Sequence, residues 1–117
     1  MSNSSPVRDT ATFPEDEIGD KLYSAALRGR SLDEDQDIDF AFLFAKKFDA
    51  ETFASRLLSD GYTAEIEHLP EEEGEVEEWE VLTTCDMRPT HADVKAQLDK
   101  LTALAHNHYG KLAYWIA

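Results

Sequence analysis

The sequence predicts an α+β fold in which a four-stranded antiparallel sheet carries two helices on one face. After a first helical segment, stretches of apolar residues with a period of two or with helical spacing follow in the order strand, helix, strand, strand, helix, strand. This is the order of the ferredoxin-like βαββαβ sandwich, and right-handed crossovers place both helices on the same face. A chain of 117 residues is long enough for one such domain and its core.

The chain is expected to form a single domain with an N-terminal extension. Residues 1–13 are polar and aperiodic, which predicts a flexible tail, and residues 14–117 are expected to form the α+β domain. Within it we expect an extra helix over 14–29 and the ferredoxin-like core over 36–117. Proline and acidic residues suit the start of the extra helix, and Gly29 suits its end. Its apolar stripe is thin, so we expect it to be peripheral.

Three segments alternate with a period of two and are predicted to be strands: 37–44, 62–67 and 78–85. A final strand is predicted over 111–117, which is short and very apolar. In the first segment, Ile38, Phe40, Phe42 and Phe44 fall on one face, which we expect to lie under the helices. The second and third segments flank the acidic turn Pro70–Glu75 and are predicted to form a hairpin.

Both core helices have recognisable boundaries. Asp49 is predicted to be the N-cap of the first, with Phe48 and Phe53 as a hydrophobic staple and Gly61 as the residue that closes it. Thr90 is predicted to be the N-cap of the second helix, which we expect to end at Gly110.

The alternation that buries the phenylalanines predicts that acidic side chains point away from the helices. Like charges that face each other across strands are destabilising, so either the fold tolerates some cost in stability or a partner or the N-terminal helix relieves it. We interpret this acidic face as the candidate partner-binding surface, and the alternative is a solvated face that only keeps the protein in solution. Leu43 and Leu82 are expected on the same face. The candidate partner-binding residues are Asp37, Asp39, Glu65, Glu67, Glu78 and Glu80.

The net charge of the chain limits the classes of partner that it is expected to bind. Eleven Lys and Arg stand against 25 Asp and Glu, a net charge of −14, which repels phosphate backbones and favours a basic protein partner over direct contact with nucleic acid. No apolar stretch is long enough to predict a membrane span. One cysteine, Cys85, cannot form an internal disulfide, which predicts a cytoplasmic location.

No motif predicts catalysis, a metal or a cofactor. The run Asp35, Asp37, Asp39 lacks the glycine and glutamate that a calcium loop needs at its sixth and twelfth positions, because Phe40 and Lys46 stand there. Cys85 shares the core parity of its strand, and its neighbour Asp86 and the acidic chain are expected to raise the pKa of its thiol, so a packing role is expected. The four histidines have no zinc-ligand spacing. Two alternatives stay open: a small ligand-binding domain or enzyme, and a structural domain that forms homo-oligomers through the apolar last strand.

The chain resembles the regulator of ribonuclease activity B family, the protein inhibitors of ribonuclease E. Four segments carry the resemblance, over about residues 36 to 117. The family's final Tyr-Asp-Gly-Trp motif reads Leu112–Trp115 here, and only its tryptophan matches. The four segments are Asp39–Phe44, Arg56–Tyr62, Trp79–Val81 with Met87–His91, and Leu104–Gly110.

The resemblance implies a cytoplasmic, non-catalytic protein of ferredoxin-like fold that binds an RNA-degrading endoribonuclease and alters which transcripts it cuts. In that family the contact is attributed to the basic, Arg-rich scaffold region of the enzyme, which suits an acidic surface. The implied protein is a monomer or weak homodimer without a cofactor.

Overall fold

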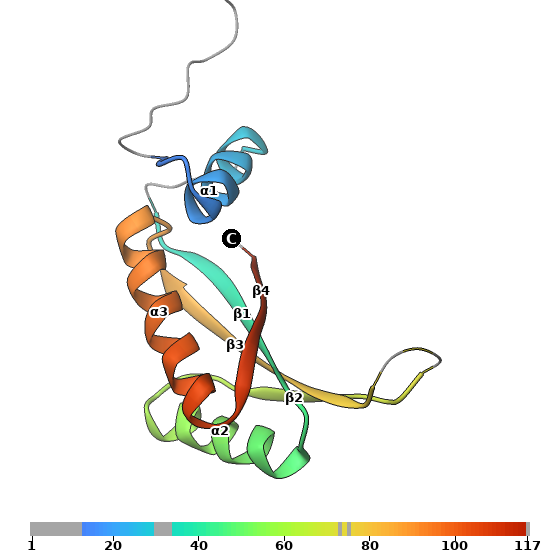
Figure 1. Ribbon diagram of the computed structural model, residues 1–117. Helices are drawn as coiled ribbons and strands as arrows, with labels where there is room; N and C mark the ends of the chain where they lie inside the picture. The colour runs from blue at the N-terminus through green and yellow to red at the C-terminus, as the bar shows by residue number, and fades with distance from the viewer. Residues whose placement is uncertain (1–12, 30–33, 73, 75, 117) are drawn as a thin grey trace, which may run out of the picture.

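The computed structural model describes residues 13–29, 34–72, 74 and 76–116 (Figure 1). The predicted N-terminal tail lies outside the described residues except for Phe13, whose ring packs against Tyr23 with 5.5 Å between centroids. The elements, in chain order, are α1 (Glu17–Leu27), β1 (Gln36–Phe44), α2 (Lys47–Ser59), β2 (Glu65–Leu69), β3 (Glu78–Met87), α3 (His91–Asn107) and β4 (Gly110–Ile116).

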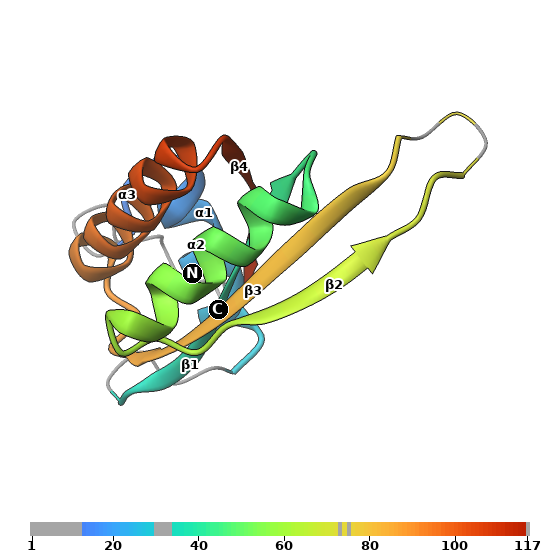
Figure 2. The ribbon, with the colours of Figure 1, turned by 90° about the horizontal axis from the view of Figure 1, so that it is seen from below.

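The predicted fold class is confirmed. The four strands form one antiparallel sheet in the order β2-β3-β1-β4, and α2 and α3 lie on the same side of it (Figure 2). This is the strand order of a βαββαβ sandwich, with β1 and β3 in the centre and β2 and β4 at the edges.

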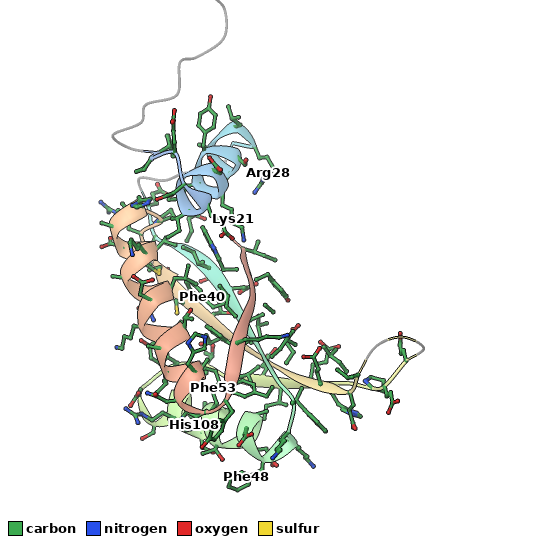
Figure 3. The ribbon with its side chains drawn as sticks, in the orientation of Figure 1. Lys21, Arg28, Phe40, Phe48, Phe53 and His108 are labelled. Atoms are coloured by element: carbon green, nitrogen blue, oxygen red, sulfur yellow. The ribbon has the colours of Figure 1, made fainter. Side chains whose placement is uncertain are left out.

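The core lies between this sheet and its two helices, as the alternation predicts. Ile38, Phe40, Phe42 and Phe44 are almost fully buried, and Phe53 of α2 packs among them (Figure 3). Their partners in β3 also face the helices, since Phe42 pairs with the buried Val81.

Helix α2 begins earlier than predicted. Its N-cap is Lys46, whose side chain makes no capping hydrogen bond, and Asp49 lies in the first turn. The predicted staple is wrong as well, because Phe48 is 75% exposed and points away from the body of the protein (Figure 3). The predicted end is confirmed: Gly61 has a φ of 90°, and the N–H of Tyr62 donates to the carbonyl of Leu57 in a Schellman motif.

Helix α3 has the predicted start and a different end. The Thr90 hydroxyl accepts a hydrogen bond from the N–H of Asp93 at 3.2 Å, which confirms the N-cap. At the other end, Tyr109 takes the left-handed conformation with a φ of 67°, while Gly110 already belongs to β4. Gly110 is required for another reason: a Cβ at this position would overlap the ring of Phe44.

Helix α1 lies beside the start of α3 and the end of β4, at one end of the sheet (Figure 1). Asp16, its N-cap, contacts His91 of α3 at 2.7 Å. The ammonium group of Lys21 donates to the carbonyl of Trp115 at 3.0 Å and lies 4.7 Å from the centroid of the same indole. Charged and aromatic contacts therefore hold α1 in place, in addition to the buried side chain of Leu22.

The hairpin of β2 and β3 projects beyond the rest of the molecule (Figure 2). Strand β2 begins at Glu65, three residues later than predicted, while Tyr62 and Ala64 before it still pack against the core. Along the hairpin the ring of His68 stacks on Trp79, with 5.1 Å between centroids.

Candidate interaction surface

The sheet has a second face, opposite α2 and α3, which we call the open face. In the described part of the chain, α2 and α3 contact the sheet from the other side only (Figure 2). The pairing register determines which residues share this face, because side chains alternate along each strand. It holds Asp37, Asp39, Ala41 and Leu43 of β1, Glu65, Glu67 and Leu69 of β2, Glu78, Glu80, Leu82, Thr84 and Asp86 of β3, and Lys111, Tyr114 and Ile116 of β4.

Four of the six predicted acidic residues lie together on β2 and β3. Glu67 is directly opposite Glu80, Glu65 is opposite Leu82, and Glu78 lies two residues before Glu80 on the same strand. Directly opposed residues have Cβ atoms about 5 Å apart, so the side chains of Glu67 and Glu80 leave the sheet as direct neighbours at the centre of this group. We call Glu65, Glu67, Glu78 and Glu80 the acidic row.

The other two predicted residues lie apart from this row. Asp39 is opposite Thr84, whose hydroxyl donates to its carboxylate at 2.7 Å. Asp37 is opposite Asp86 at the far end of β1. Asp86 lies six positions beyond Glu80 along β3, which corresponds to about 20 Å of strand. All six carboxylates therefore share the open face in the pairing register, but only four of them form a compact group.

Next to the acidic row runs an apolar strip of Ala41, Leu43, Leu82, Tyr114 and Ile116. Sequence reasoning identified the two leucines on this face but missed Tyr114 and Ile116. A β-bulge explains this, because Ala41 pairs with Tyr114 while Phe42 pairs with Leu112, which leaves Ala113 unpaired. The extra residue reverses which side chains of β4 point to each face after Ala113, and the local sequence pattern does not predict this reversal.

Tyr114 connects the strip to the acidic row. Its hydroxyl donates a hydrogen bond to Glu80 at 3.4 Å, so its side chain reaches across β1 and accounts for the complete burial of Ala41 beneath it. Partial burial raises the pKa of Tyr114, and so do the charge and hydrogen bond of Glu80 and the charges of Asp39 and Glu67. Burial is the largest cause of the raised pKa, and the negative potential over this part of the sheet adds to it.

Replacing Glu80 by glutamine is expected to lower the pKa of Tyr114 toward the ordinary value of about 10. The substitution removes a negative charge that disfavours the phenolate. The measurement is an NMR titration of the tyrosine ring signals, with Glu51→Gln on α2 as the control that leaves this pKa unchanged. An unaltered titration in Glu80→Gln would show that the carboxylate does not act on Tyr114.

The comparison with known protein families identifies the chain. The family model described as "Regulator of ribonuclease activity B" matches residues 15–115. The protein belongs to this family. The match to the regulator of ribonuclease activity B family runs from the residues before α1 into β4, so it includes the whole acidic row and confirms the predicted resemblance. No curated protein and no solved structure matches the chain.

Two surface pockets lie away from the acidic row of this family member. One, of about 290 Å³, lies between α1 and the end of β4 and is lined by Lys21, Arg28 and Trp115 among others (Figure 3). The other, of about 370 Å³, is lined by Ala45, Lys46, Asp49 and Tyr109. None of the six predicted acidic residues lines either of these two.

Other features bear on the sequence-based expectations. Cys85 is half-buried against the core, and burial raises the pKa of its thiol, which disfavours the nucleophilic thiolate. Among the residues that the structure describes, no group of three or more His, Cys, Asp or Glu side chains could hold a metal ion. Nor does any helix within those residues have the length and apolarity needed to cross a membrane.

Proposed function

We propose that this protein regulates an RNA-degrading endoribonuclease of the ribonuclease E type by binding it in the cytoplasm, without catalysis of its own. Membership of the regulator of ribonuclease activity B family supports the regulatory role. The acidic row supports a basic segment of the enzyme as the bound element. The observation that carries the proposal is the direct opposition of Glu67 and Glu80 in the middle of that row.

Opposed carboxylates cost stability in the free protein, and a basic partner would remove that cost. On the described open face, Lys111 is the basic residue in the sheet, and its ammonium group lies 4.0 Å from Glu78. Whereas Glu78 has this lysine nearby, the cross-strand neighbour of Glu67 is another glutamate, Glu80. Arginine side chains of a partner can form paired hydrogen bonds with carboxylates, which gives orientation as well as attraction. Complementary potentials also speed the encounter of the two proteins.

Reversing the charge of the two opposed residues is expected to weaken binding to the endoribonuclease by at least about tenfold at low salt. The variant carries Glu67→Lys and Glu80→Lys. The measurement is the dissociation constant of the full chain with a purified ribonuclease E-type enzyme at several salt concentrations, together with the rate at which the enzyme cleaves RNA. Binding by the natural chain should weaken as salt rises, because surface charges are screened.

The matched control reverses two exposed acidic residues elsewhere, Glu15→Lys and Glu51→Lys, which changes the net charge by the same amount. The control should bind nearly as well as the natural chain, and both variants should keep the circular dichroism spectrum of the fold. Equal weakening by both variants would mean that only net charge matters. Absence of binding to the enzyme at every salt concentration would overturn the proposed function.

A further inference from the structure

The apolar strip gives the open face a second kind of binding chemistry. Leu43 and Leu82 are half-buried, whereas Tyr114 is 39% and Ile116 54% exposed. The strip adjoins the acidic row at three places: Leu82 is opposite Glu65, Leu43 is opposite Glu80, and Tyr114 donates to Glu80. A face whose only task is to stay solvated has no need of large apolar side chains between its charges.

A bound segment is expected to lie across this face rather than extend the sheet at β4. The edge of β4 is already obstructed, because Lys21 of α1 donates to the carbonyl of Trp115 and Ala113 forms a bulge. Bulges and lysines are common devices that prevent the addition of another strand. Among the described residues, α2 and α3 lie on the opposite side of the sheet, and α1 lies beside this face only at its Ile116 end (Figure 2).

We propose that the open face binds an amphipathic segment, with arginine or lysine residues on one side and large apolar residues on the other. The basic side contacts the acidic row, and the apolar side packs on Leu43, Leu82, Tyr114 and Ile116. This inference rests on the proposed function and narrows the partner to one class of segment. A second copy of the chain fits less well, because two copies placed face to face bring their acidic rows together.

The two kinds of contact respond differently to salt, which allows them to be separated. Contacts between the acidic row and basic side chains weaken as the ionic strength rises. Burial of apolar area on Leu82 and Ile116 contributes affinity without a comparable screening effect. A substitution in the strip should therefore lower the affinity at every salt concentration and leave the salt dependence unchanged, whereas a substitution in the acidic row should reduce that dependence.

The experiment uses two synthetic arginine-rich peptides of equal length and charge, one with leucine and one with serine between the arginines. Their binding to the full chain is measured by calorimetry over a range of salt concentrations. The leucine peptide should bind about tenfold more tightly than the serine peptide. In the variant Leu82→Thr with Ile116→Ser, this advantage should be largely lost while the salt dependence persists.

Ile66→Ser is the matched control. Ile66 is 42% exposed but lies on the helix side of the same sheet, opposite Val81, so its loss should not change the preference for leucine. If the natural chain binds the two peptides equally while the endoribonuclease still binds through the acidic row, the amphipathic partner is overturned and the proposed function stands. If neither peptide nor the enzyme binds, the proposed function fails as well.

Sedimentation of the chain without peptide tests self-association as the alternative use of the strip. We expect a monomer. A dimer that dissociates in Leu82→Thr with Ile116→Ser, but persists in Ile66→Ser, would assign the strip to a second copy and overturn the proposal.

Discussion

Replacing Phe53 with alanine is expected to lower the free energy of unfolding by about 3–5 kcal/mol. Its ring is completely buried and packs against Phe42 and Phe44, with centroid distances of 5.4 and 5.1 Å, and against His108 at 6.0 Å. Alanine would leave a cavity between α2 and the sheet. Because a domain of this kind is typically stable by only about 5–15 kcal/mol, the loss should be evident in urea unfolding followed by circular dichroism.

Phe48→Ala on the same helix is the control for this substitution. It removes the same side chain from a position that is 75% exposed, so the free energy of unfolding should change by no more than about 0.5 kcal/mol. The pair also tests where α2 begins. If Phe48 packed on Phe53 as a hydrophobic staple, its removal would cost a measurable fraction of the stability, and a large loss in Phe48→Ala would contradict the structure.

The features that sequence reasoning predicted correctly depend on short-range geometry. The side of β1 on which Phe40 and Phe42 lie follows from a period of two, which holds for any regular strand. The ends of the helices at Gly61 and Thr90 follow from backbone conformation and side-chain hydrogen bonds within a few residues. The position of Glu67 and Glu80 on the open face follows from the same alternation once the hairpin pairs them.

The features that were missed depend on contacts between distant parts of the chain. Helix α2 begins at Lys47 although no capping side chain marks that start, and its contacts with the core are made further along, by Phe53 and Leu57. Gly19 weakens α1 when judged by helix propensity alone, yet a Cβ there would overlap the carbonyl of Pro14. Tyr114 reaches the acidic row only because a bulge shifts β4 by one residue.

The same distinction applies to the candidate site. Alternation placed acidic side chains on one face, but the register was needed to separate the compact acidic row from Asp37, which lies opposite Asp86. The register also shows that the apolar strip lies beside the acidic row. The charge that we propose for the partner therefore follows from the sequence, whereas the apolar side that we propose for it depends on the pairing of β4 with β1.

Replacing Gly110 with alanine is expected to lower the free energy of unfolding by about 1–3 kcal/mol. The added Cβ would overlap the ring of Phe44, which is 1% exposed and confined by Phe53, so neither the ring nor β4 can move aside freely. Alanine also restricts the unfolded chain, which by itself stabilises a protein by about 0.4–1 kcal/mol, and the steric cost must exceed this gain. Thermal and urea unfolding would measure the net effect.

A second substitution distinguishes overlap with the ring from backbone strain as the cause. Phe44→Leu shortens the side chain that the new methyl group would meet, so the double variant should lose less stability than the sum of the two single variants. If the glycine were needed for a left-handed backbone at the end of α3, Phe44→Leu would give no such relief. That conformation belongs to Tyr109, with a φ of 67°, so we expect coupling between positions 44 and 110, and strict additivity would contradict this account.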